Sequence, residues 1–128
     1  MPIRRRRHAF TLLEVMLVLL IIGLLATVAA VNLVGASDRA REQQTKTSIK
    51  MIESALKQYY FTHGRYPTSE EGLMTLVPDY LESQPLDAWK RPFVYFSPGT
   101  GGRDFEIISL GRDGNADTED DIVSWELE

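Results

Sequence analysis

Five carboxylates fall within nine residues near the C-terminal end of the sequence, at Asp113, Asp117, Glu119, Asp120 and Asp121. Carboxylates this close together repel one another unless water or a cation screens their charge. Calcium takes about six to eight oxygen ligands and accepts carboxylates together with backbone carbonyls. The chain has no cysteine, and neither histidine lies near this run, so zinc and copper sites are not expected. The run predicts either a calcium site or a solvated acidic turn without a metal.

One known calcium-binding pattern can be tested directly against this run. The spacing of Asp113, Asn115 and Asp117 matches the first ligands of an EF-hand loop. The remainder of that pattern fails, because Thr118 stands at the glycine position and Ser124 at the position of the bidentate glutamate. A helix–loop–helix calcium site is therefore not expected.

A single carboxylate, Glu14, lies at the leading edge of a long apolar stretch. Residues 15–37 contain no ionisable side chain. At about 1.5 Å per residue, a helix of this length crosses a hydrocarbon layer of roughly 30 Å. The arginines at positions 4–7 should stay cytoplasmic, which places the C-terminal bulk of the chain across the membrane. A charge at Glu14 costs about 2.5–3.5 kcal/mol in the bilayer unless it has a partner.

Two ordinary kinds of N-terminal segment share some of these features. A secretory signal peptide has an apolar core of about 7–15 residues, shorter than this one, and residues 26–30 only weakly resemble its cleavage site. A plain signal anchor explains everything except Glu14 and the AFTLLE sequence around it.

The sequence RRHAFTLLEVMLVLLIIGLLATVA resembles the N-terminus of type IV pilins and pseudopilins. In that family a prepilin peptidase cleaves before the phenylalanine of an FTLLE-like motif and methylates the new amine. The resemblance places the cut between Ala9 and Phe10, and it assigns Glu14 the role of the family's glutamate in assembly. The family usually has glycine where this chain has Ala9. Loss of residues 1–9 would take the formal net charge from −4 to −8.

The helix is expected to continue beyond the apolar stretch, because residues 36–61 contain neither glycine nor proline. Apolar residues at spacings of three and four predict a stripe that packs on a domain, formed by Ile49, Ile52, Leu56 and Tyr59 or Tyr60. We expect one helix over about residues 11–62, bent near Gly35 and ended by Gly64 in a left-handed conformation. Alternatively, Ser37 and Asp38 cap a second helix.

The rest of the chain predicts short elements around this helix. Thr68 and Glu71 have the spacing of a capping box, which predicts a short helix through Val77. Apolar, β-branched and aromatic runs predict three antiparallel strands, at Phe93–Phe96, Phe105–Ser109 and Val123–Leu127. The expected fold is α+β: a long N-terminal helix, transmembrane in its first half and amphipathic in its second, packed on a small antiparallel sheet with an acidic C-terminal loop.

Further motifs resemble the major pseudopilin of type II secretion systems. Its pattern YPT-x-E-x-GL corresponds to residues 66–73 here, and its L-P-x-DPWG-x-P pattern corresponds to the stretch around residues 85–92, with Ala88 and Lys90 in place of the family's proline and glycine. Trp89 in that stretch is interpreted as a core or helix-covering aromatic.

Members of this family carry a C-terminal calcium loop that begins LG-x-DG and closes with acidic residues before isoleucine. Both ends match this chain, whereas the family's intervening glycines are absent. The resemblance implies calcium ligation by the side chains of Asp113, Asp120 and Asp121 and by the carbonyls of Leu110 and Arg112. Whether Asp117 also binds is left open.

The function that this resemblance implies is structural. The chain would be the major subunit of a type II pseudopilus, polymerising through its N-terminal helix to help export folded proteins across the outer membrane. The expected parts are a cytoplasmic leader (1–9), a transmembrane and assembly helix (10–35) and a periplasmic domain (36–128). The implied partners are copies of the chain, minor pseudopilins, the inner-membrane assembly platform and the prepilin peptidase. The implied location is the bacterial inner membrane as a single-pass protein, and the periplasm once assembled.

Other functional classes are less consistent with the sequence. The acidic balance argues against nucleic-acid binding. We expect no enzyme, because there is no nucleophile elbow, phosphate-binding glycine loop or zinc motif. A type IV pilus subunit shares the N-terminus but normally ends in a disulfide-closed region, which a chain without cysteine cannot form. A membrane-anchored, non-polymerising calcium-binding module is the other alternative.

Overall fold

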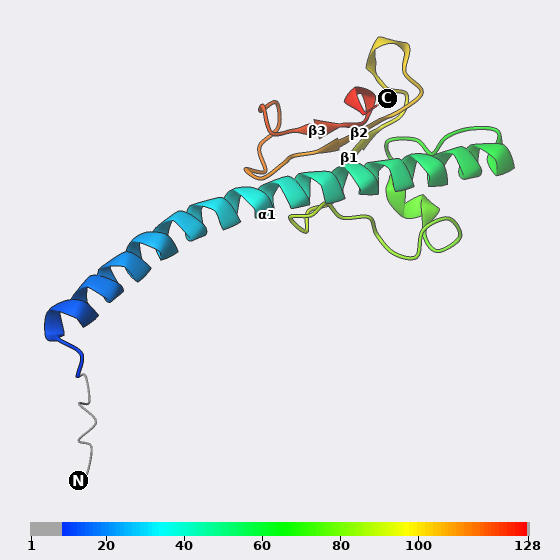
Figure 1. The fold of residues 1–128 in the computed structure, drawn as a ribbon. Helices are drawn as coiled ribbons and strands as arrows, with labels where there is room; N and C mark the ends of the chain where they lie inside the picture. The colour runs from blue at the N-terminus through cyan, green and yellow to red at the C-terminus, as the bar shows by residue number, and fades with distance from the viewer. Residues whose placement is uncertain (1–8, 128) are drawn as a thin grey trace, which may run out of the picture. The chain divides into compact units, whose positions relative to one another are not determined.

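The computed structural model describes residues 9–127, except for the side chains of residues 32–34. Its elements are a long helix followed by three short strands and three 3-10 helices (Figure 1). The chain divides into two compact units, one ending at Ser37 and the other beginning at Asp38. The arginines at positions 4–7 and most of the predicted leader lie outside the described residues. The predicted domain boundaries and the bend near Gly35 stay predictions.

Helix α1 spans Leu12–His63, close to the predicted range. Thr11 caps its start, since the Thr11 Oγ1 accepts a hydrogen bond from the Glu14 amide at 3.2 Å. Its C-terminal end has the predicted left-handed glycine, with Gly64 at φ 73° and its amide donating to the Tyr60 carbonyl at 2.8 Å. The alternative in which Ser37 and Asp38 begin a second helix is wrong, because α1 continues through both residues.

The predicted apolar stripe of α1 forms one side of the core. Ile49, Ile52 and Leu56 are each no more than 1% exposed. Of the two tyrosines that the sequence offered, Tyr59 is buried and Tyr60 is 43% exposed. The sheet and loops supply the other side of this core, through Leu73, Leu76, Phe93, Tyr95, Ile107 and Ile122.

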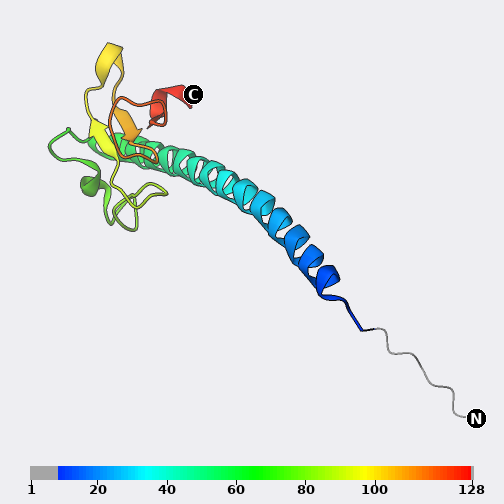
Figure 2. The same cartoon turned by 90° about the vertical axis from the view of Figure 1, so that its left-hand side faces the viewer.

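The sheet has three antiparallel strands in the order β1-β2-β3, which are Val94–Phe96, Glu106–Ser109 and Ile122–Val123. In Figures 1 and 2 the sheet lies along the C-terminal half of α1, consistent with their shared core. The predicted third strand is present, but its predicted range, Val123–Leu127, is wrong, because β3 contains only Ile122 and Val123. The chain turns into the 3-10 helix η3, Ser124–Glu126, after two strand residues. Its Ser124 hydroxyl accepts the Ile107 amide at 3.1 Å, in place of a backbone ladder bond.

The predicted capping box forms, but the helix that it was expected to begin does not. The Thr68 amide donates to Glu71 Oε2 at 2.7 Å, and the Glu71 amide donates to Thr68 Oγ1 at 3.3 Å. Gly72 then adopts φ 65°, which breaks the turn, and the 3-10 helix η1 spans Leu73–Leu76. The turn cluster between β1 and β2 contains a third 3-10 segment, η2, Thr100–Gly102.

Candidate functional site

Residues 10–31 of the N-terminal unit present a predominantly apolar surface. The large apolar side chains from Phe10 to Val31 are exposed, and α1 is long and apolar enough to cross a membrane by length and composition. Ala9 and Phe10 are exposed and precede the helix, so the bond predicted to be cut lies in a non-helical segment. Such a segment is accessible to a peptidase.

Glu14 lies in the first turn of α1, in a shallow apolar hollow that Phe10 and Val18 also line. The ion pairs among the described residues do not include Glu14. A carboxylate on an apolar surface needs a compensating charge when that surface is buried. The position of Glu14 therefore suits a partner supplied by another molecule.

The second candidate site is the acidic loop, residues 110–121, which joins β2 to β3. The hydroxyl of Thr118 lies among its carboxylates. Thr118 Oγ1 is 2.6 Å from Asp120 Oδ1, and 3.4 Å from both Asp113 Oδ1 and Asp121 Oδ1. A hydroxyl has one hydrogen, so it can satisfy only one of these oxygens, and the shortest distance identifies Asp120. The three carboxylates that the sequence singled out thus converge on one side chain.

Backbone amides hold these carboxylates in place. The Asp113 amide donates to Asp120 Oδ2 at 3.0 Å, and the Asp117 amide donates to Asp121 Oδ2 at 2.8 Å. Hydrogen bonds from the Thr118 hydroxyl, and next from the Asp113 amide, lower the pKa of Asp120 from 3.8 to about 2. Asp120 is therefore charged at neutral pH, and its contribution to stability is lost only as the pH falls from about 3.8 towards 2.

The acidic loop offers oxygen atoms, which are the type of ligand that calcium prefers. The oxygens around Thr118 Oγ1 come from three carboxylates and from the Asn115 carbonyl, at 3.2 Å. The predicted carbonyl ligands each accept one hydrogen bond, Leu110 from the Gly114 amide at 3.0 Å and Arg112 from Arg91 Nη2 at 3.2 Å. Each carbonyl keeps a second lone pair. Within residues 9–127, no three Asp, Glu, His or Cys side chains are arranged to hold a metal directly. Calcium would thus require the Thr118 hydroxyl to move aside or to become a ligand.

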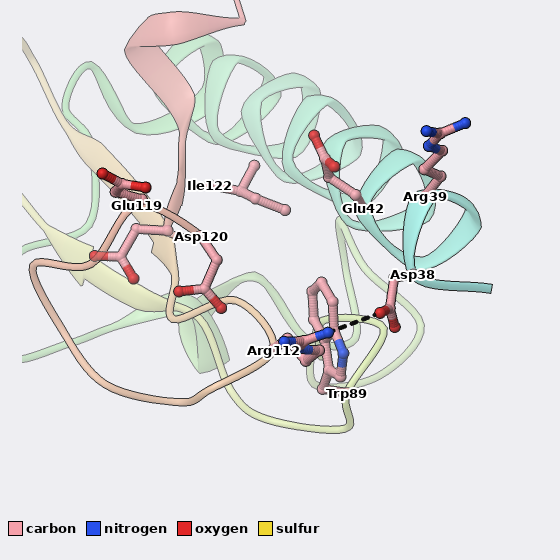
Figure 3. A pocket seen from close by; sticks show the side chains of 9 residues that line it. Asp38, Arg39, Glu42, Trp89, Arg112, Glu119, Asp120 and Ile122 are labelled. Atoms are coloured by element: carbon pink, nitrogen blue, oxygen red, sulfur yellow. Dashed lines mark hydrogen bonds and ion pairs between the residues drawn. The ribbon is translucent and has the colours of Figure 1, made fainter. Parts of the chain in front are cut away.

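A hollow of about 310 Å³ lies between the acidic loop and the first turns of the second unit (Figure 3). The Arg112 side chain crosses it and pairs with Asp38, with Nη1 2.9 Å from Oδ2. Asp38 was a candidate helix cap in the sequence. It instead lies within α1 and forms the ion pair that links α1 to the acidic loop. Trp89 lines the same hollow and packs on the core, as predicted. Among the described residues, its Nε1 is the one buried side-chain polar atom without a hydrogen-bond partner.

Asp87 is the site residue that sequence reasoning missed. Its side chain is 3% exposed. Asp87 Oδ1 accepts the amides of Trp89 and Arg91, each at 2.9 Å, and Oδ2 accepts the Ser109 hydroxyl at 2.8 Å. The Asp87 carboxylate thus joins the turn before β1 to the end of β2. The only signal in the sequence was its place in the DPWG-like pattern.

Two residues that carry side chains have left-handed backbone torsions. Lys90 adopts φ 65°, and Asp117 adopts φ 62°. Positive φ is unfavourable for residues with a side chain, though less so for aspartate. These two turns therefore have backbone torsions that favour glycine, although neither residue is a glycine.

Comparisons with known proteins identify the family. A family model described as type II secretion system (T2SS), protein G, matches residues 32–125, and a prokaryotic N-terminal methylation motif matches residues 4–30. A type II secretion system core protein G from Aeromonas hydrophila is 40% identical, over 97% of this chain and 96% of that protein. The chain belongs to the type II secretion system protein G family. The Escherichia coli K12 core protein G is 35% identical, over 95% of this chain and 93% of that protein.

A solved structure agrees with this membership in the protein G family. The major pseudopilin from the type 2 secretion system of enterohaemorrhagic E. coli has a TM-score of 0.64 and 35% identity, covering 74% of this chain and 95% of that chain. The predicted family, the α+β fold and the function as a major structural subunit of the pseudopilus are confirmed. The methylation motif and the apolar helix also fit anchoring in the inner membrane.

Proposed function

We propose that this member of the protein G family polymerises through the apolar part of α1 after a prepilin peptidase removes residues 1–9. The observation that carries the proposal is the exposed apolar surface from Phe10 onward, which directly follows an exposed, non-helical Ala9–Phe10 bond. The arginines stay cytoplasmic and residues 36–128 form the periplasmic domain. Assembly involves the inner-membrane platform and minor pseudopilins, and the domain has no catalytic role.

Processing provides the direct test. In cells with an active prepilin peptidase, the mature protein should begin at Phe10 and carry a methylated amine. Intact mass of the membrane-extracted protein reports both changes together. A protein that keeps Met1 would contradict the proposal, and cleavage near Ala30 would return the segment to the signal-peptide class.

Glu14 is proposed to offset the Phe10 amine of a neighbouring subunit during assembly. Glu14→Ala should remain inserted in the membrane and yield far less filament, because the incoming amine has no counter-charge. Glu70→Ala, an exposed carboxylate in the second unit, is the matched control and should assemble normally. Filament yield after crosslinking is the measurement. Equal yields from the two variants would remove the pairing role.

We also propose that the acidic loop binds calcium through the carboxylates of Asp113, Asp120 and Asp121, with the carbonyls of Leu110 and Arg112. The support is the all-oxygen surroundings of Thr118 Oγ1. A ligand that binds only the native state stabilises it by about 2.7 kcal/mol at a hundredfold excess over Kd. The melting temperature should therefore rise by roughly ten degrees or more for a domain of this size.

Thermal melts of the full chain in detergent, with calcium, magnesium or chelator, test this proposal. Both tryptophans, Trp89 and Trp125, lie in the second unit, so their fluorescence follows this domain. Magnesium should substitute poorly, because it demands a tight octahedron. Asp113→Ala should abolish the calcium shift, whereas Asp117→Ala should retain it if Asp117 is not a ligand. Identical wild-type melts in all three solutions would leave the acidic loop a solvated turn.

A further inference from the structure

Arg91 has an unusual pair of partners. Its Nη1 donates to the Gly111 carbonyl at 2.6 Å, and its Nη2 donates to the Arg112 carbonyl at 3.2 Å. Both acceptors lie about twenty positions away, at the start of the acidic loop. The ion pairs among the described residues do not include Arg91, so this guanidinium is directed at backbone carbonyls.

The turn at residues 111–114 closes around this guanidinium. The Gly114 amide donates to the Leu110 carbonyl at 3.0 Å, which brings Gly114 back over the turn. A Cβ on Gly114 would lie only 2.7 Å from Arg91 Cζ. The Arg91 side chain therefore fills the turn, and Gly114 leaves the room that it needs.

The backbone of Arg91 is fixed from the other side. The Arg91 amide donates to Asp87 Oδ1, and the Asp87 amide donates to the Arg91 carbonyl, each at 2.9 Å. Asp87 Oδ2 accepts the Ser109 hydroxyl, and Ser109 Oγ accepts the Gly111 amide at 3.3 Å. Both the amide and the carbonyl of Gly111 are thus linked to Asp87, one through Ser109 and the other through Arg91.

We infer that Arg91 is a positioning residue for the acidic loop, and that its guanidinium is a resident cation which fixes the carbonyls of Gly111 and Arg112 without a metal. A guanidinium suits this role because its planar fork reaches two acceptors at once and stays charged. An ammonium offers a point charge in place of that fork. The second part of the inference rests on the proposed calcium site: Arg91 already fixes the Arg112 carbonyl, so calcium would bind it through its second lone pair and organise the carboxylates.

Hydrogen exchange of the full chain in detergent micelles tests the inference. The reporters are hydrogen-bonded loop amides of Gly111, Asp113, Gly114 and Asn115. In chelator, Arg91→Met should make these amides exchange roughly tenfold faster. The amides of β1 and β2 should keep their rates, and Arg91→Lys should fall between Arg91→Met and wild type. Arg65→Met, which removes an exposed arginine paired with Glu71, is the control and should leave the loop unchanged.

Two results would overturn the positioning role. One is a loop that exchanges at the wild-type rate in Arg91→Met. The other is an equal acceleration in β1 and β2, which would report general loss of stability. A second set of exchange measurements, made with calcium in place of chelator, separates the positioning role of Arg91 from calcium binding. If the acidic loop binds calcium, the metal should slow the exchange of the loop amides in Arg91→Met. The change in their exchange rate should be larger there than in wild type. If calcium changes nothing in any variant, the calcium proposal fails while the chelator arm still decides the role of Arg91.

Discussion

Replacing Asp87 by alanine should lower the free energy of unfolding of the second unit by about 3–4 kcal/mol. The change removes a buried acceptor of three hydrogen bonds, from two backbone amides and the Ser109 hydroxyl. Buried donors that lose their acceptor keep the cost of their desolvation. A domain of this size is stable by only about 5–15 kcal/mol, so the loss is a large fraction of the total.

Urea denaturation followed by tryptophan fluorescence measures this effect. Asp79→Ala removes an exposed carboxylate from the same unit and should change the stability by no more than about 0.5 kcal/mol. Asp87→Asn keeps one carbonyl acceptor and should be intermediate. A loss below about 1 kcal/mol in Asp87→Ala would show that water or a relaxed turn replaces the carboxylate.

Gly111→Ala should also cost more than about 3 kcal/mol, through two separate causes. Gly111 has φ 59°, where a Cβ is unfavourable. The added Cβ would also lie 2.7 Å from both the carbonyl carbon and Oδ2 of Asp120, and closer still to the Asp120 carbonyl oxygen. Relief of that overlap would have to push the two ends of the acidic loop apart, so Gly111→Ala should also weaken any binding of calcium.

Gly64→Ala separates these two causes. Gly64 has a similar φ of 73°, but a Cβ there would meet nothing within 4 Å. It should therefore cost only about 1–2 kcal/mol, the penalty of the left-handed backbone. The difference between the two variants in the same urea titration measures the close approach of Asp120. Equal losses would mean that the loop moves away from the added carbon without cost.

Features that depend on residues close together along the chain could be predicted without the structure. Helix α1 and its buried face followed from the spacing of Ile49, Ile52 and Leu56, because a helix repeats every 3.6 residues. The capping box of Thr68 and Glu71 and the left-handed Gly64 were also predictable, since each involves atoms within three or four positions. The family motifs also identified the three carboxylates of the acidic loop that the structure brings together.

Contacts between groups far apart along the chain became visible only in the folded structure. Asp87 and Ser109 are 22 positions apart, and Arg91 and Gly111 are 20 apart, so no local pattern signals their hydrogen bonds. The third strand ends early for the same reason: the Ser124 hydroxyl takes the Ile107 amide, 17 positions away. Short-range preferences fix backbone torsions, whereas such bonds form only after the core has brought separate segments together, when a buried polar group must take whichever partner lies within reach.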